Sequence, residues 1–149
     1  MDNLRNPVEI VERKHIRLQC FGNFEVFADN IPICFLRAKS KEMLAYITDR
    51  MGAACTMGQL MSVLWEDGQD TVSRRSNLRN SISDLKQTLA AFGAEDIIIK
   101  KRNSISLNCD AVECDYFDFI KHKPYAVNLY RGEYMLQYSW AEMTTGKLE

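Results

Sequence analysis

The longest regular hydrophobic pattern of the chain lies between residues 71 and 93. Leu78, Ile82, Leu85 and Leu89 follow one another at intervals of four, three and four positions. This is the spacing of a single apolar stripe on an α-helix, which has about 3.6 residues per turn. The pattern predicts one helix over residues 71–93, with the stripe packed against a core.

The opposite side of this helix combines short polar side chains with a cationic flank. The polar residues are Ser76, Asn80, Ser83 and Gln87, and the flank holds Arg75, Arg79 and Lys86. Serine and asparagine are moderate helix formers, so solubility alone gives little reason to concentrate them on one face. Short side chains reach base edges in a DNA major groove, while arginine or lysine reaches guanine or phosphate. The face is typical of a DNA-recognition helix, although a solvated helix of a globular domain explains it equally well when it is taken alone.

Residues 16–35 alternate between apolar and polar positions, with Ile16, Leu18, Cys20, Phe24 and Val26 on the apolar side. A period of two is typical of half-buried β-strands, and the pairs Gly22-Asn23 and Asp29-Asn30 favour turns. The segment therefore predicts a short antiparallel meander.

Two shorter helices are predicted between residues 37 and 66. Ser40 is the expected N-cap of the first and Gly52 its expected stop, while Thr56 and Gln59 have capping-box spacing at the start of the second, which should end near Glu66. Their inward faces are Met43, Leu44, Ile47 and Met51 in the first helix, and Leu60, Val63 and Leu64 in the second. Together with the longer helix, they form a helix-turn-helix arrangement.

A hairpin is predicted directly after the long helix. Two strand-like runs surround Arg102, Asn103 and Ser104, and the second run alternates Ile105, Leu107 and Cys109 with polar residues. The tip carries Lys100, Lys101 and Arg102. A basic hairpin after a recognition-type helix favours a wing that lies along phosphates or enters the minor groove, and the competing interpretation is an edge hairpin protected by lysines.

The last segment, residues 111–149, is helical in pattern and rich in aromatic residues. Tyr130, Tyr134 and Tyr138 recur every four residues and would form one ridge on a helix. Such a density suggests base stacking or packing. Packing is favoured because the aromatics share their segments with Ile120, Leu129 and Met135 at helical offsets.

Composition and charge place the chain among ordinary globular proteins. It has 149 residues, of which 46% are hydrophobic and 26% charged, and a net charge of -1. The near-neutral total excludes a protein that coats nucleic acid with a uniformly basic surface. Positive charge is nevertheless concentrated in residues 74–102, where seven cations and three acids leave a charge of +4.

Candidate chemistry is sparse. The five cysteines are scattered and lie in apolar or strand-like segments, which is typical of reduced thiols, and neither they nor the two histidines have zinc-site spacing. We expect no metal and no cofactor. No nucleophile–base pair, carboxylate pair or glycine-rich phosphate loop has supporting context, so an enzyme is not expected. Without an apolar run of membrane length or a signal peptide, a cytoplasmic protein is predicted.

Read in order, these segments resemble the OmpR/PhoB-type winged-helix effector domain, in the variant found in SARP-like response regulators that end in a bacterial transcriptional activator region. The resemblance covers nearly the whole chain. It rests on "IRLQCFGNFEVF" as the opening strands, "KSKEMLAYITDRMG" and "LMSVLWED" as the first two helices, "LRNSISDLKQTL" as the recognition helix, "IIIKKRNSISLN" as the wing, and "CDYFDFI" with "YRGEYMLQYSWAE" as the start of the activator region.

The fold class implied by this resemblance is α+β: a winged helix-turn-helix with an N-terminal antiparallel sheet, a three-helix core, a C-terminal wing hairpin and a helical tail. Residues 1–14 would be a linker from a receiver domain absent from this chain, residues 15–110 the winged-helix domain, and residues 111–149 the tail. Because one helical unit cannot bury both of its faces, the tail should fold back on the winged helix or pair with a second chain.

The resemblance also implies DNA-binding residues. The groove-facing set would be Asn80, Ser81, Ser83, Asp84 and Lys86, with Arg74, Arg75 and Arg79 on phosphate or bases and Lys101 and Arg102 on the wing. Many relatives place arginine where this chain has Ser83 and Asp84, so no base preference is inherited. A groove-facing aspartate either accepts from cytosine or repels phosphate.

The predicted function is a sequence-specific DNA-binding transcriptional regulator, the effector half of a two-component response regulator. Its expected partners are double-stranded DNA, a second copy in a homodimer and RNA polymerase, with no membrane. The alternative is a protein-interaction module that keeps the winged-helix fold without specific DNA binding. The two differ in salt dependence, because DNA binding that neutralises several phosphates weakens steeply as salt rises.

Overall fold

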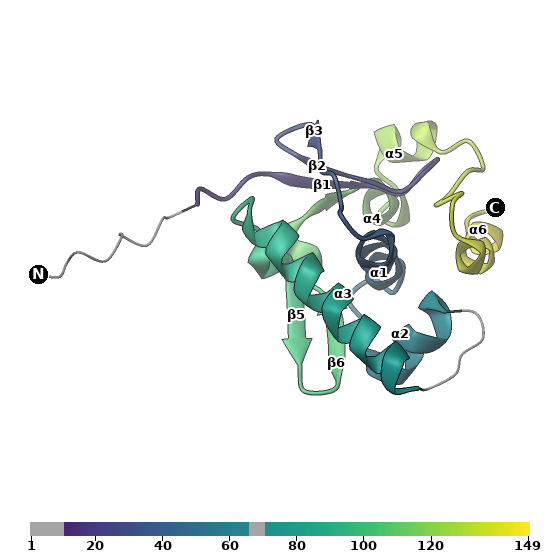
Figure 1. Ribbon diagram of the computed structural model, residues 1–149. Helices are drawn as coiled ribbons and strands as arrows, with labels where there is room; N and C mark the ends of the chain where they lie inside the picture. Colours follow the sequence, from purple (N-terminus) through teal and green to yellow (C-terminus); the bar gives the residue numbers. More distant parts are fainter. Residues whose placement is uncertain (1–10, 66–70) are drawn as a thin grey trace, which may run out of the picture.

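The computed structural model describes residues 11–65 and 71–149, which form a mixed α+β fold with two small sheets, six α-helices and one hydrophobic core (Figure 1). The first sheet has the order β3-β2-β1-β7, and its strands are β1 (Ile16–Gln19), β2 (Glu25–Ala28), β3 (Ile31–Pro32) and β7 (Glu113–Cys114). Strands β1 to β3 are the predicted antiparallel meander, whereas β7 adds to β1 in parallel. Ile16, Leu18 and Val26 are fully buried, as the period of two predicts.

Helix α1 (Ala38–Asp49) buries Met43, Leu44 and Ile47, as predicted, but its ends differ from the prediction. The N-cap is Arg37, and Ser40 lies inside the helix, where its hydroxyl donates to the Ser81 carbonyl at 3.0 Å. The prediction of Ser40 as the N-cap is wrong, because local sequence spacing does not reveal the contact of Ser40 with a distant helix. Met51 lies beyond the helix at a positive φ of 53° and is exposed.

Helix α2 (Met57–Leu64) follows the short strand β4 (Cys55–Thr56) and has the predicted capping box. The Gln59 backbone N–H donates to Thr56 Oγ1 at 3.1 Å, and the Thr56 N–H donates to Gln59 Oε1 at 2.8 Å. These bonds satisfy two amides that a helix start otherwise leaves unpaired. The predicted end near Glu66 lies outside the described residues.

Helix α3 (Val72–Ala90) confirms the long predicted helix. Thr71 Oγ1 caps it by accepting from the Arg74 N–H at 3.1 Å, and the whole predicted apolar stripe is buried. At its far end Gly93 has a φ of +67°, and a Cβ there would lie 2.9 Å from Arg13 Cα. Residues 12–14, predicted to be part of a linker, therefore pack against the end of α3.

The predicted hairpin consists of β5 (Ile98–Lys101) and β6 (Ser104–Leu107), and its turn is Arg102-Asn103. β4 pairs with β6, so the second sheet has the order β4-β6-β5. The predicted strand runs are slightly too long, because Ile97 belongs to the 3-10 turn Glu95–Ile97 and Cys109 to the 3-10 turn Cys109–Ala111.

The segment after β7 contains α4 (Asp115–Ile120), α5 (Pro124–Leu129), the 3-10 turn η4 (Ser139–Ala141) and α6 (Glu142–Leu148). The predicted helical ridge of Tyr130, Tyr134 and Tyr138 is wrong. Residues 130–138 are irregular, because their backbone pairs with the turn after β1: Met135 N–H donates to the Cys20 carbonyl at 2.8 Å, and Gly22 N–H donates to the Glu133 carbonyl at 2.9 Å.

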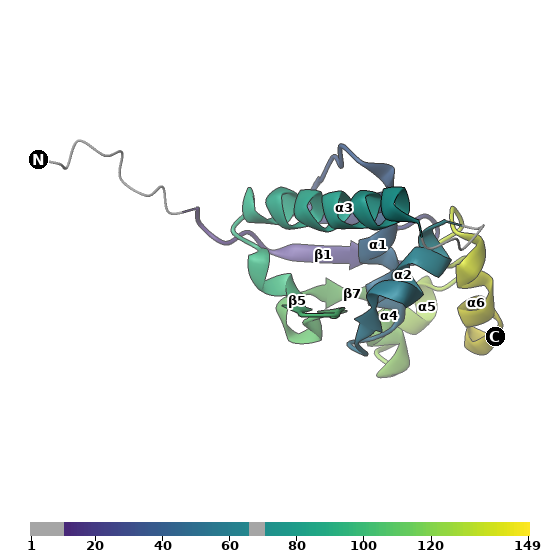
Figure 2. The ribbon, with the colours of Figure 1, turned by 60° about the horizontal axis from the view of Figure 1, so that its bottom comes forward.

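The tail folds back on α1, which confirms the predicted packing of its aromatic residues. Tyr134 is 2% exposed, and its hydroxyl donates to Asp49 Oδ1 at 2.6 Å. Trp140 Nε1 donates to Glu42 Oε2 at 2.9 Å, so two acidic residues of α1 hold the tail. In both views α5 and α6 lie at the end of the molecule away from the β5–β6 hairpin (Figures 1 and 2).

Candidate nucleic-acid interface

The outer side of α3 is the first half of the candidate interface. Because the apolar stripe packs inward against α1 and α2, most polar residues of α3 face solvent. The exposed polar side chains are Ser73, Arg75, Asn77, Arg79, Asn80, Ser83, Lys86 and Gln87. The hydroxyl of Ser40 on α1 holds the Ser81 carbonyl, so α3 is fixed to α1 by a buried hydrogen bond as well as by packing.

The β5–β6 hairpin forms the second half, because its residues line one hollow together with residues of α3. Between them runs a groove of about 500 Å³. Five cations border this groove: Arg75, Arg79 and Lys86 from α3, and Lys100 and Arg102 from the hairpin. Among the described residues no acidic side chain lines it, so the positive charges reinforce one another and create an anion-attracting surface.

The floor of the groove is apolar. It consists of Met57 and Met61 from α2, and of Leu78 and Ile82 from the buried stripe of α3. Ser83 and Asn103 complete the lining. In this groove, cationic side chains thus surround an apolar part of the core surface.

A smaller hollow of about 210 Å³ lies along α3 and is lined by Arg37, Asn80, Ser83, Asp84 and Gln87. Ser83 borders both hollows. Asp84 is half-buried, and its Oδ2 atom is enclosed without a hydrogen-bond partner among the described residues. The polar side of α3 therefore contains one hydrogen-bond acceptor, Asp84 Oδ2, to which no described group donates.

The structure brings together most of the residues that the sequence assigns to DNA binding. Arg75, Arg79, Ser83, Lys86 and Arg102 line the groove, and Asn80 and Asp84 line the adjoining hollow.

Three residues lie elsewhere. Ser81 is 2% exposed, so its side chain cannot reach a base, and the prediction that it belongs to the groove-facing set is wrong. Arg74 packs its guanidinium 5.4 Å from the Trp65 ring centroid, at the start of α3. Lys101 is exposed but does not line the groove, because side chains alternate along β5 and Lys100 occupies the groove side.

Lys100 was predicted at the basic tip of the hairpin but outside the DNA-binding set, and Arg37, Met57, Met61 and Asn103 were not predicted as lining residues. The period of two in a strand places Lys100 and Arg102 on one side of the hairpin, so this signal was available. Arg37 precedes α1 and meets α3 only through the tertiary fold, for which no local pattern exists.

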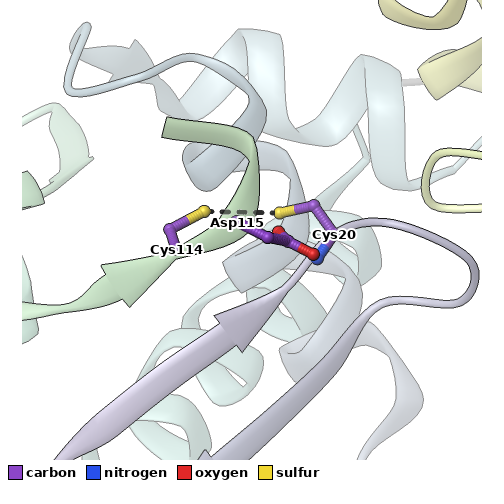
Figure 3. A group of neighbouring side chains, drawn as sticks. All are labelled: Cys20, Cys114 and Asp115. Atoms are coloured by element: carbon purple, nitrogen blue, oxygen red, sulfur yellow. Dashed lines mark hydrogen bonds between the residues drawn. The ribbon is translucent and has the colours of Figure 1, made fainter. Parts of the chain in front are cut away.

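A second cluster of reactive side chains lies in the core, where β1 meets the start of α4 (Figure 3). The Sγ atoms of Cys20 and Cys114 are 3.6 Å apart, and donor atoms of Cys20, Cys114 and Asp115 lie within 4.8 Å of one another. The Asp115 carboxylate accepts backbone N–H groups from Cys20 at 2.8 Å, Phe21 at 3.0 Å and Tyr116 at 2.7 Å.

Burial is the main cause that raises the pKa of the Cys20 thiol well above its usual range, and it also raises the pKa of Asp115. Both shifts favour the protonated forms, whereas metal binding requires thiolates. Three amide donors already use the Asp115 oxygens. The cluster is explained as a hydrogen-bonded junction that ties the tail to the first sheet.

Comparisons with known proteins bear on the fold. No protein-family model matches the sequence, and a search of curated proteins finds no significant match. Among solved structures, EmbR from Mycobacterium tuberculosis, in complex with a low affinity phosphopeptide, superposes with a TM-score of 0.74 at 16% sequence identity. The chain shares the fold of EmbR. The match covers 91% of this chain and 42% of that chain, so the chain spans about two fifths of the EmbR structure. Within the described ranges, no helix has the length and apolar character needed to cross a membrane.

Proposed function

We propose that the chain is the DNA-binding part of a transcriptional regulator, with a winged helix-turn-helix in which α3 enters the major groove and the β5–β6 hairpin is the wing. The observation that carries this proposal is the groove between the two elements. Five cations from α3 and the hairpin border it, and no acidic residue in the described part of the chain lines it, which complements the negative charge of a DNA backbone.

The centre of α3 supplies the groups for base reading. A major groove about 12 Å wide admits one helix, and Asn80 and Ser83 are exposed and short enough to approach base edges. Arg75, Arg79, Lys86 and Arg102 contact phosphate or guanine, and Lys101 contacts the backbone from the outer side of the wing. Asp84 borders this side of α3, where an acidic side chain either accepts from the amino group of cytosine or repels phosphate.

The fold shared with EmbR supports this proposal, because the α+β arrangement of the chain is the one that the sequence resemblance implies. The proposal extends to residues 15–110 as the winged helix and residues 111–149 as the start of an activator region. It also includes a receiver domain in the longer protein, a homodimer on paired half-sites, contact with RNA polymerase and a cytoplasmic location. No catalytic step is part of it.

Selection of bound duplexes from a random-sequence DNA pool tests this function. The protein should enrich a short motif, read through the exposed side of α3, and should bind that motif more tightly than a shuffled sequence of the same composition. An absence of enrichment, together with salt-insensitive binding of a protein partner, would instead support the protein-interaction module.

A further inference from the structure

The apolar floor of the groove between α3 and the β5–β6 hairpin has no role in phosphate binding. Phosphate contacts need only cations and N–H donors, whereas Met57, Met61, Leu78 and Ile82 offer neither. Methionine side chains are flexible and polarizable, so they adapt to the shapes of different apolar ligands. Met61, Leu78 and Ile82 are 2% to 8% exposed and Met57 is half-buried, so the apolar contact area that DNA phosphates do not use lies mainly on Met57.

The charge of the rim and the volume of the groove further limit the class of ligand that the groove can bind. Its volume of about 500 Å³ lies in the range of small-molecule sites, roughly 300 to 1,000 Å³. Within residues 11–65 and 71–149, all charged residues that line it are cations. A hollow at the opposite end of the molecule contains Arg17 and Arg131 but also Glu113 and Glu133, so it lacks this selectivity for anions.

We infer that this groove binds a small amphipathic anion, whose apolar body lies on the methionine floor and whose acidic group lies among Arg79, Lys86 and Arg102. The ligand occupies the surface assigned to DNA and therefore competes with it. The competition rests on the proposed function, whereas ligand binding itself does not. Such a site makes the DNA-binding surface directly sensitive to a metabolite of this chemical class.

Three probe compounds distinguish binding to the apolar floor from binding to the cationic rim, and the two with an octyl chain are used below their micelle-forming concentrations. Octyl phosphate has both the chain and the charge, octyl glucoside has the same chain without the charge, and inorganic phosphate has the charge alone. Methyl signals of the methionines report binding without DNA. Octyl phosphate should shift the signals of Met57 and Met61 in a saturable way and leave that of Met143, which is 77% exposed on α6, unchanged.

A matched pair of variants locates the apolar contact. Met57→Gln keeps the length of a half-buried side chain but places an amide on the floor. It should weaken octyl phosphate about fourfold, the effect of losing roughly one methylene of apolar contact. Met143→Gln should change nothing. Equal affinity of the parent and Met57→Gln would overturn the methionine floor as the binding surface.

The remaining outcomes are decisive as well. Octyl phosphate should displace a bound fluorescent duplex in proportion to its occupancy measured by the methionine signals. Absence of shifts at Met57 and Met61, or equal binding of octyl glucoside or inorganic phosphate, would overturn the ligand site. Occupancy without displacement would overturn the competition. If octyl phosphate binds and no duplex does, the ligand site stands and the proposed DNA-binding function fails.

Discussion

Arg75 and Arg79 stand one helical turn apart at the edge of the groove, and both are exposed. Replacing both with alanine should weaken duplex binding by about 1 to 3 kcal/mol for each good contact that is lost. The fold should be unaffected, because neither side chain belongs to the core. Fluorescence anisotropy at one fixed salt concentration measures the effect. Arg131→Ala, at an exposed tail position, is the control, and a double variant that binds as tightly as this control would contradict the prediction.

Asp115 has a structural task that a nearly isosteric substitution tests. Asp115→Asn keeps one acceptor oxygen but replaces the other with an NH₂ group, which cannot accept the N–H of Cys20, Phe21 or Tyr116 facing it. The variant should lose about 1 to 3 kcal/mol of unfolding free energy, the cost of an unsatisfied buried amide. Urea denaturation measures the loss. Asp110→Asn, at an exposed position, serves as the control, and equal stability of the two variants would show that the carboxylate does not hold the junction.

The sequence predicted which residues belong to α3 better than it predicted the direction in which each side chain points. Arg79 and Ser83 follow helical spacing and are exposed as expected, because their positions depend only on the helix period. Ser81 is adjacent to the buried stripe, and its fate depended on the distance between α1 and α3, which small side chains at Ser40 and Ser81 permit. That distance is a tertiary quantity that no local pattern contains.

Among the elements, the hairpin offers the clearest separate test. Neutralising Lys101 and Arg102 should lower affinity for all duplexes alike, because a wing that contacts backbone carries no base information. The slope of log affinity against log salt should flatten by about one for each lost phosphate contact. Neutralising Lys121 and Lys147, two exposed tail lysines, should leave the slope unchanged. A loss confined to the selected motif would instead indicate base reading by the hairpin.

Elements defined by a repeating pattern were predictable, and those defined by distant pairing were not. The capped helix α2, the stripe of α3 and the alternation in β1 and β6 follow from local spacing. Strand β7 contains two residues and exists only because Cys114 lies opposite Leu18 of β1. Residues 130–138 likewise became an irregular segment through pairing with residues 20–22, although their tyrosine spacing fitted a helix.

For the molecule as a whole, the buried tyrosines of the tail make stability depend on alkaline pH. Burial raises the pKa of Tyr116 to about 12 and also raises those of Tyr134 and Tyr138, whereas an unfolded tyrosine ionises near pH 10. Because the folded-state pKa is the higher one, this stability is fully present below about pH 10 and is lost as the pH rises through about 12.

Urea denaturation at several pH values between about 8 and 11.5 should therefore show falling stability above pH 10. In Tyr116→Phe the fall should be shallower, by up to about 1.4 kcal/mol per pH unit for one group. Below pH 9 the two proteins should have the same pH slope, which serves as the internal control. An identical alkaline decline in both proteins would mean that Tyr116 ionises as freely in the folded state as in the unfolded chain.

The tail supports the candidate interface through α1. Helix α1 contacts the tail through Asp49 and Glu42 and contacts α3 through Ser40. Removing residues 125–149 exposes the α1 surface that Tyr134 covers. We expect a lower melting temperature in thermal denaturation, without loss of affinity for single-stranded nucleic acid. An unchanged melting temperature together with a loss of that affinity would favour base stacking by the tail over packing.

We propose that α3 and the hairpin bind duplex DNA through both its charge and its sequence. Equilibrium binding to the selected duplex and to a shuffled duplex, each followed across a salt series, tests both parts in one experiment. We predict that log affinity falls linearly with log salt for both duplexes, by about 0.9 per phosphate contacted, and that the selected duplex binds about 1,000-fold or more tightly throughout. Binding that is independent of salt, or equal for the two duplexes, would contradict the account.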